Sequence, residues 1–195
     1  FVDDDVRIRV LDINSEEIMT IDVGGNNIER GFNGLTWSPD SNWLAYSKTG
    51  SNSFRQIVAW SREENNVSPL TNAFADAFAP SWDRNGKHIY FLASTDLALG
   101  SSWASTSAIP SQPEYAAYII NLNETSNSPF EPLSDEETNQ EVAATEADSE
   151  GEPTAVSVVI DIEGIGRRIL ALPLPARNYR TTISGPSGSV FIGEQ

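Results

Sequence analysis

The side chains that carry most enzyme chemistry are scarce in this sequence. It contains one histidine, His88, and no cysteine. A Ser or Thr nucleophile needs a base within hydrogen-bond distance that a third group orients. His88 directly follows a turn-like segment, where we expect it to be exposed or packed against a neighbouring element. A single histidine without cysteine also argues against a zinc site. We therefore predict no catalytic residue, no metal ligand, no cofactor-binding residue and no cofactor in this chain.

Short catalytic motifs are also missing from the sequence. It has no Gly-x-Ser-x-Gly, His-Glu-x-x-His or Gly-x-x-x-x-Gly-Lys pattern. Carboxylates are abundant, but groups such as Asp3-Asp4-Asp5 and Glu16-Glu17 lie in turn-like or terminal segments. Acid/base catalysis needs two carboxylates in different environments, and their spacing indicates no such arrangement.

Two basic residues near the C-terminal end could contact an anion. Arg167 and Arg168 could bind the C-terminus of a peptide, but strand alternation would send them to opposite faces, so at most one could do so. Asp161 and Arg168 flank a predicted turn. We expect them to pair across a hairpin, which is a structural role.

The charge of the chain limits its partners. The net charge is −16, whereas a nucleic-acid surface needs clustered Lys and Arg to displace counterions. No run approaches the roughly 20 apolar residues of a membrane span. We expect neither nucleic acid nor membrane as a partner. We expect a cytoplasmic location, with a periplasmic one as the alternative. The lack of cysteine excludes disulfides but does not decide the compartment.

A repeated segment is the most informative feature. Leu35–Ser47 aligns with Pro80–Leu92, and this places Trp37 and Trp82 45 residues apart. A period of about 40 to 50 residues is typical of β-propeller blades. Each copy has the pattern strand, turn, strand, with the turn residues Pro, Asp, Asn and Gly between two apolar runs. A degenerate third copy lies at Asn178–Ile192.

Further strands should complete each blade around these hairpins. The expected ones are Val6–Ile13, Ile18–Val23, Gln56–Ser61, Val67–Thr71 and Tyr115–Leu122. The last strand of the second blade is either Phe130–Leu133 or a segment displaced past an insertion. After that insertion, Ala155–Ile162 and Arg168–Leu174 are predicted strands on either side of the turn Gly164-Ile165-Gly166.

Two insertions lengthen the second repeat. Ser94–Glu114, rich in Ser, Ala and Pro, is an excursion between the second and third strands of the blade. Ser134–Pro153 contains eight Asp and Glu residues and no Lys or Arg. Such a segment buries too little apolar surface to offset its ordering entropy, so we predict a disordered loop. A regulatory or cation-binding segment is the alternative.

The predicted fold is all-β: a partial β-propeller of four-stranded antiparallel blades, about three to four blade equivalents, with a disordered acidic insertion. The predicted units are residues 1–33 (end of one blade and connector), 34–78 (blade), 79–133 (blade with the 94–114 excursion), 134–153 (acidic loop) and 154–195 (outer strands and the start of the next blade).

These motifs resemble the propeller region of tricorn-type proteases, which are large serine peptidases. The Trp-Ser-Pro-Asp hairpin at Trp37 also occurs in TolB-type and prolyl-oligopeptidase-like propellers. The more specific resemblance lies in Ser134-Asp135-Glu136-Glu137, in Ile160-Asp161-x-x-Gly164-Ile165-x-x-Arg168 and in Leu172-Pro173-Leu174-Pro175-Ala176-x-Asn178-Tyr179. It runs along essentially the whole chain, with the acidic loop as a variable insertion.

The resemblance implies a role for the chain and a set of partners. In that family the catalytic residues lie in later domains, so none can be carried onto this sequence. The resemblance implies a scaffold that admits oligopeptides to a serine peptidase, with the remaining domains of the parent chain as partners and with homo-oligomers. The alternatives are a non-enzymatic TolB-like propeller that binds a protein partner, and an oligopeptidase with an α/β-hydrolase domain.

Overall fold

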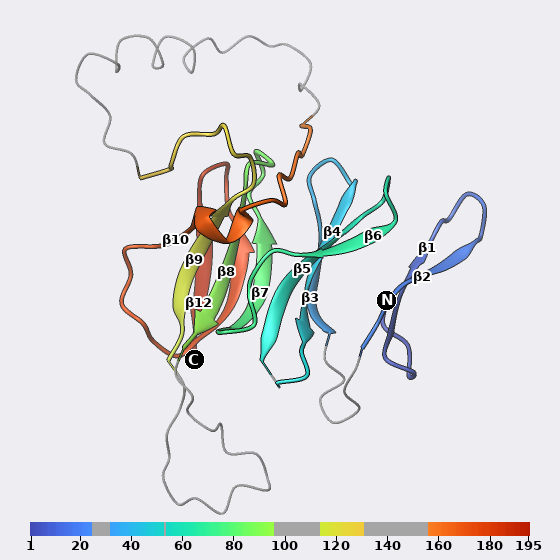
Figure 1. The fold of residues 1–195 in the computed structure, drawn as a ribbon, viewed down its shortest axis with the longest axis horizontal. Helices are drawn as coiled ribbons and strands as arrows, with labels where there is room; N and C mark the ends of the chain where they lie inside the picture. Colours follow the sequence, from blue (N-terminus) through green and yellow to red (C-terminus); the bar gives the residue numbers. More distant parts are fainter. Residues whose placement is uncertain (25–31, 53, 96–113, 131–155) are drawn as a thin grey trace, which may run out of the picture.

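The computed structural model describes residues 1–24, 32–52, 54–95, 114–130 and 156–195 (Figure 1). Nearly all regular structure in them is β. The elements are β1 (Arg7–Leu11), β2 (Ile18–Val23), β3 (Phe32–Trp37), β4 (Trp43–Thr49), β5 (Arg55–Ser61), β6 (Asn66–Pro69), β7 (Asp76–Trp82), β8 (His88–Ser94), β9 (Ala116–Asn121), the 3₁₀ turn η1 (Ile165–Arg168), β10 (Ile169–Ala171), β11 (Tyr179–Ser184) and β12 (Val190–Glu194).

The strands form four antiparallel sheets in chain order. Two sheets have four strands, β3-β4-β5-β6 and β7-β8-β9-β10, and the hairpins β1-β2 and β11-β12 flank them. The sheets stand face to face in a row, so that β3 contacts β7 and β7 contacts β11 (Figure 1). The predicted all-β fold, a partial β-propeller of four-stranded antiparallel blades, is confirmed.

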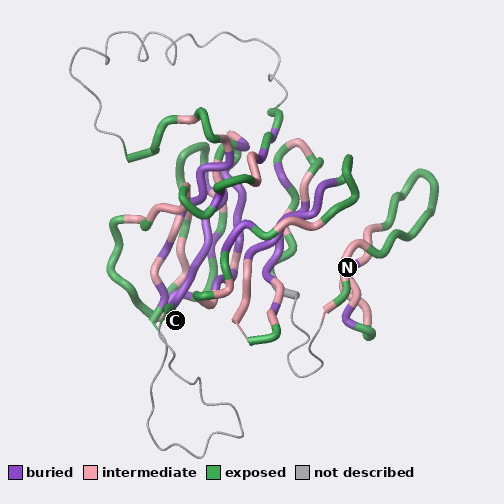
Figure 2. The backbone as a smooth tube through the Cα atoms, in the orientation of Figure 1, coloured by how far each residue is buried: buried purple, intermediate pink, exposed green. Residues whose placement is uncertain are grey.

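The two central sheets contain most of the buried residues (Figure 2). The middle strands β4, β5, β8 and β9 are buried on both faces, because each central sheet is covered by a sheet on either side. This is why these strands are almost continuously apolar or small instead of alternating with polar residues. The largest apolar cluster lies between the two central sheets and includes Ile57, Leu70, Trp82, Ile89 and Ile120.

The first strands of the two central sheets share an irregularity. The register of β3 shifts between Asn33 and Thr36, and that of β7 shifts between Phe78 and Ser81. Gly34 and Ala79, 45 residues apart, both have positive φ there. A Cβ atom on Gly34 would lie 3.0 Å from Pro80 Cδ of the next blade. The repeat therefore includes a bulge at which adjacent inner strands approach closely.

The hairpins around Trp37 and Trp82 form where the sequence predicted them, as β3-β4 and β7-β8. Of the two alternatives for the last strand of the second blade, the structure shows the displaced one. β10 pairs with β9 through Ile169 and Ile120. Phe130 lies in a turn, and residues 131–133 lie outside the described residues.

The prediction of a strand at Ala155–Ile162 is wrong. Residues 156–162 have no regular secondary structure and belong to no sheet, and we call residues 156–164 the strap. The main chain of the strap bonds to side chains and to a loop instead of to a strand: Val158 N–H donates to Asp40 Oδ2 at 2.9 Å, and Asp161 N–H donates to Leu122 O at 3.0 Å. The predicted strand Arg168–Leu174 is shorter, at Ile169–Ala171.

Other predictions fall largely outside the described residues. These include most of the 94–114 excursion and the whole 134–153 acidic loop. Within the described residues, no helix is long and apolar enough to cross a membrane.

Candidate functional site

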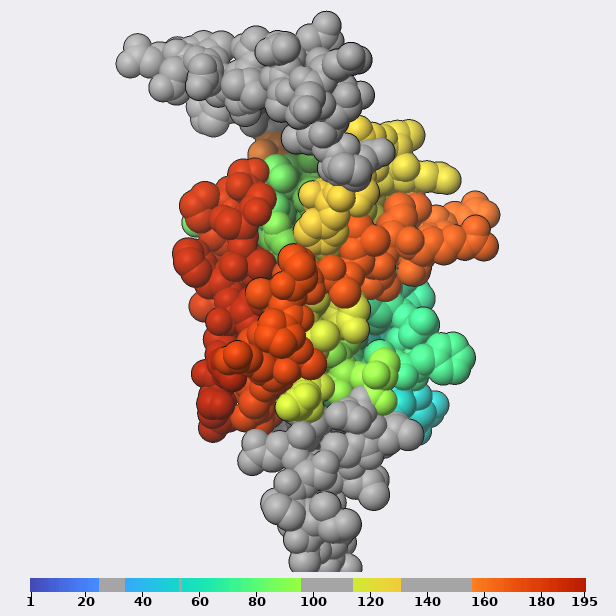
Figure 3. Space-filling view, turned by 90° about the vertical axis from the view of Figure 1, so that its left-hand side faces the viewer, coloured from blue at the N-terminus to red at the C-terminus, as the bar shows by residue number. Residues whose placement is uncertain are grey.

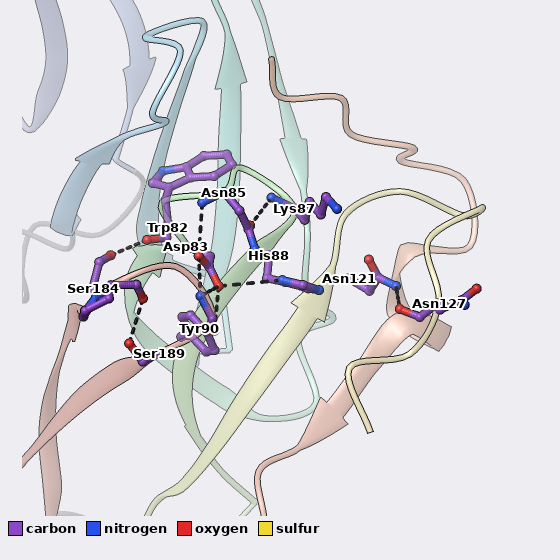
Figure 4. A network of polar contacts seen from close by, with 12 residues as sticks. Trp82, Asp83, Asn85, Lys87, His88, Tyr90, Asn121, Asn127, Ser184 and Ser189 are labelled. Carbon is purple, nitrogen blue, oxygen red and sulfur yellow. Dashed lines mark hydrogen bonds and ion pairs between the residues drawn. The ribbon is translucent and has the colours of Figure 1, made fainter. Parts of the chain in front are cut away.

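Asp83 is the most deeply buried carboxylate in the described part of the molecule, and it begins the turn between β7 and β8. Its carboxylate accepts hydrogen bonds from Tyr90 Oη at 2.8 Å, from Asn85 N–H at 3.1 Å and from Gly188 N–H at 3.0 Å (Figure 4). Gly188 belongs to the turn of the next hairpin, β11-β12. Burial, together with the bond to Asp83, raises the pKa of Tyr90. Asp83 therefore links two adjacent blades.

His88 lies beside Asp83 but makes no catalytic arrangement with it. His88 Nδ1 is 3.8 Å from Asp83 Oδ2, beyond hydrogen-bond distance, and this nitrogen is buried without a hydrogen-bond partner. Burial lowers the pKa of His88, although the nearby Asp83 charge partly opposes this. Of the two expected placements, exposed or packed against a neighbouring element, the structure shows the second, since the side chain is only 13% exposed.

The expected pairing of Asp161 and Arg168 occurs in another form. Arg168 Nη2 donates to the main-chain oxygen of Asp161, and Arg168 Nε donates to Asn121 O at 3.1 Å. The Asp161 carboxylate instead accepts from Glu124 N–H at 2.8 Å. The two side chains therefore form no ion pair with each other. Arg167 and Arg168 lie in η1 and not on a strand, so strand alternation does not place them.

Hydrogen bonds between inner strands are the feature that sequence reasoning missed. Trp82, the last residue of β7, donates from Nε1 to Thr36 O of β3 at 3.0 Å. Ser184, the last residue of β11, donates from Oγ to Trp82 O (Figure 4). Thr182 Oγ1 also donates to Ala79 O, at 2.5 Å. β7 is thus bonded to β3, and β11 is bonded to β7. The 45-residue spacing of Trp37 and Trp82 marks equivalent positions in the repeat, but it does not signal a bond to a main-chain oxygen.

The strap connects the two central blades at their hairpin turns. Beside the bond from Val158 N–H to Asp40, Trp43 Nε1 donates to Val158 O at 3.3 Å. On the other blade, a Cβ atom on Gly86 would lie 2.8 Å from the side chains of both Val156 and Val158. Figure 3 shows the segment that follows residue 156 (orange) lying across the surface next to the C-terminal hairpin (red).

An open cleft of about 770 Å³ lies between the β1-β2 hairpin and the first central blade. The hairpin contributes Leu11, Ile18 and Met19, and the blade contributes Trp37 and Trp60. The two indole rings meet edge to face at 6.2 Å between centroids. Among the described residues there is no group of three or more His, Asp or Glu side chains that could hold a metal ion.

The sequence of the chain is similar to those of two proteins with tricorn-type names. No protein-family model matches the sequence. The chain is 29% identical over 190 residues to Tricorn protease homolog 1 of Streptomyces coelicolor, and the match covers 96% of this chain and 17% of that protein. It is 25% identical over 158 residues to a protein of Sulfurisphaera tokodaii named Putative Tricorn-like protease C-terminal subunit, covering 81% of this chain and 16% of that protein.

A solved structure agrees with these sequence matches. The crystal structure of the tricorn protease superposes with a TM-score of 0.65 at 18% identity, over 97% of this chain and 17% of that one. This likeness supports the fold. The chain thus spans about a sixth of the length of the proteins it matches. Together with the sheet topology, the matches identify the chain as a relative of the tricorn-type proteases that corresponds to part of their β-propeller region.

Proposed function

We propose that this chain is a scaffold and substrate-access segment of a tricorn-like serine peptidase that degrades oligopeptides. The observation that carries the proposal is the match to Tricorn protease homolog 1 over 190 residues, 96% of the chain. In this proposal the peptidase chemistry belongs to other domains of the longer protein. Those domains and further copies of the protein are the proposed partners, and the cytoplasm is the proposed location.

The blade arrangement supports an access role. The inner strands β3, β7 and β11 belong to successive sheets and contact one another in sequence. In a propeller the first strands of the blades surround the central channel. The hydrogen bonds from Trp82 and Ser184 fix the distance between neighbouring inner strands, so the width of the channel is held constant. In this proposal the channel admits extended peptides and excludes folded proteins.

Arg180 is the residue we place at the edge of the channel. It lies on β11 where the register shifts between Tyr179 and Thr181, and its side chain is exposed. A bulge of this kind turns a side chain away from the face of the sheet.

The test uses the longer protein that contains this chain. We expect it to hydrolyse fluorogenic oligopeptides and to be inactivated by a serine-directed fluorophosphonate. Arg180→Trp should lower kcat/KM for long peptides more than for dipeptide substrates, because it narrows the entrance. The matched control is Asn66→Trp, which changes an exposed residue on the outermost strand β6.

Two results would contradict the proposal. One is a longer protein that hydrolyses no peptide and instead retains a protein partner, as the TolB-like alternative predicts. The other is an equal effect of Arg180→Trp and Asn66→Trp on long and short substrates, which would leave peptidase activity without an access role for this chain.

A further inference from the structure

Trp37 and Trp82 hold the same position in the repeat but have different surroundings. Trp82 is 3% exposed, whereas Trp37 is 44% exposed and lines the cleft beside β1-β2. Trp82 is covered by the inner strands of the blade before it, with β3 and β4 both in contact with β7. The β1-β2 hairpin covers β4 and β5 through Val6 and Ile8. The β1-β2 hairpin therefore occupies the position of the outer half of a blade. No described strand occupies the position of the inner half of that blade, which would cover Trp37 as β3 and β4 cover Trp82.

The hydrogen bonds of the inner strands indicate what Trp37 should bind. The last residues of β7 and β11 each donate from a side chain to a main-chain oxygen of the preceding inner strand. Trp37 is the last residue of β3. Its Nε1 meets no acceptor in the described part of the chain. If Trp37 follows the pattern of Trp82 and Ser184, its acceptor is a main-chain carbonyl oxygen on the inner strand of the preceding blade.

The edge of β1 shows how that inner half is connected. Arg9 N–H donates to Phe1 O at 2.9 Å, and Phe1 N donates to Arg9 O at 2.9 Å, so Phe1 and Val2 form the end of a strand antiparallel to β1. Main-chain groups two residues apart point to the same side of a strand. The N–H and C=O of Leu11 therefore face the same edge as those of Arg9. A strand that continued backwards from Phe1 would run along Leu11, into the cleft.

We propose that this cleft is the seat of a two-stranded β-hairpin formed by the polypeptide that precedes Phe1 in the longer protein. The second strand of that hairpin ends at Phe1 and Val2 and pairs with Leu11. Its first strand accepts a hydrogen bond from Trp37 Nε1 and presents apolar side chains to Trp37 and Trp60. The proposal rests on the proposed function only in taking the chain as part of a longer protein.

The first experiment compares two proteins by amide and indole hydrogen exchange in NMR. One is the 195-residue chain, and the other carries its native N-terminal extension of about 20 residues, enough for a hairpin as long as β3-β4 (Phe32–Thr49). We expect the extension to slow the exchange of the Leu11 amide and the Trp37 indole by at least tenfold. The Trp82 indole should exchange equally slowly in both proteins.

A second experiment uses matched variants. Trp37→Phe and Trp82→Phe each remove an indole N–H and keep an aromatic ring. In the extended protein we expect both variants to lower Tm by several degrees. In the 195-residue chain we expect only Trp82→Phe to do so, because Trp37 has no acceptor there. If Trp82→Phe fails to fold, the hydrogen-exchange comparison still decides.

The proposal is overturned if the Leu11 amide and the Trp37 indole exchange equally fast in both proteins. It is also overturned if they become protected in the 195-residue chain as its concentration rises, to the level of the extended protein. That result would place part of a second copy of the chain in the cleft. Neither readout depends on peptide hydrolysis, so this proposal and the proposed function can fail separately.

Discussion

Asp83 carries a carboxylate with no exposed surface, and its bonds come from donors on two different hairpins. Asp83→Asn would replace one acceptor oxygen by an NH₂ group that faces Tyr90 Oη or Gly188 N–H, both of which already donate. We expect it to lower the free energy of unfolding by about 1–3 kcal/mol, since a buried donor loses its acceptor. Urea denaturation measures this change.

Tyr90→Phe is the control for Asp83. It removes one donor and leaves the bonds of Asp83 to Gly188 and Asn85 in place. We expect a cost of about 1 kcal/mol, the net value of one hydrogen bond. If Asp83→Asn costs less than Tyr90→Phe, the carboxylate does not link the two hairpins.

His88 should make stability depend on pH near neutrality. Burial lowers its pKa below the usual 6.5 in the folded chain, while Lys87 adds to this and Asp83 opposes it. The unfolded chain therefore binds more protons between the two pKa values, so stability rises with pH across that window. The stability that neutral His88 contributes is fully present above about pH 7 and is lost as the pH falls through 6.5 and below.

His88→Asn removes this titration. We expect its Tm to change less than that of the wild type between about pH 7 and pH 5. Asp3, Asp12 and Asp40, whose pKa values lie below the usual 3.8, lose their stabilising effect only in stronger acid and do so in both proteins. Parallel pH profiles for the two proteins above pH 5 would show that the burial of His88 has no effect on stability.

For single residues, the sequence predicted which residues lie in strands and turns better than it predicted their hydrogen-bond partners. The spacing of Trp37 and Trp82 located both hairpins, because turn residues and apolar runs act locally. The acceptor of Trp82 is the main-chain oxygen of Thr36, 46 residues earlier, and a carbonyl oxygen carries no sequence signal. The partner of Asp161 was missed for the same reason, since its carboxylate accepts from a main-chain N–H at Glu124.

The strap is the element for which local pattern and tertiary structure disagree. Val156–Ile162 is as rich in β-branched residues as a strand, yet the edge it would need is occupied by β10, which pairs with β9. Instead of pairing with a strand, the main-chain N–H groups of Val158 and Asp161 donate hydrogen bonds to the Asp40 carboxylate and to the Leu122 carbonyl. Strand propensity describes how well a side chain packs on a half-buried surface. It does not say whether a neighbouring strand is available, and so the sequence could not distinguish a strap from a strand.

Gly86→Ala tests how tightly the strap is held. Gly86 has φ +73°, and a Cβ atom there would lie 2.8 Å from Val156 Cγ1 and Val158 Cγ2. Gly164→Ala is the control, because Gly164 has φ +69° and nothing within 4 Å of its Cβ position. We expect Gly164→Ala to cost about 1–2 kcal/mol from backbone strain alone. Gly86→Ala should cost more and speed amide exchange at Val158. Equal costs would mean that the strap moves away freely.

In the described part of the chain, two four-stranded blades lie between two hairpins, and several of the exposed apolar side chains lie on those hairpins. Ile13 is 82% exposed on β1-β2, and Phe191 and Ile183 are 64% and 59% exposed on β11-β12. A blade is stabilised by its neighbours on both faces, as in other repeat proteins. The period of the repeat predicted this succession of stacked sheets.

This architecture predicts unequal stability along the isolated 195-residue chain. Amides of β4, β5, β8 and β9, which are buried on both faces, should exchange slowest. Those of β1-β2 and β11-β12 should exchange by local opening, because each hairpin packs on one side only and has an open edge. We therefore expect a broad thermal transition, with the end hairpins partly molten below the main step, and residue-resolved hydrogen exchange would measure it. A compact monomer with uniform protection and one sharp cooperative melt would contradict this, since the terminal hairpins would then be stable without neighbouring blades.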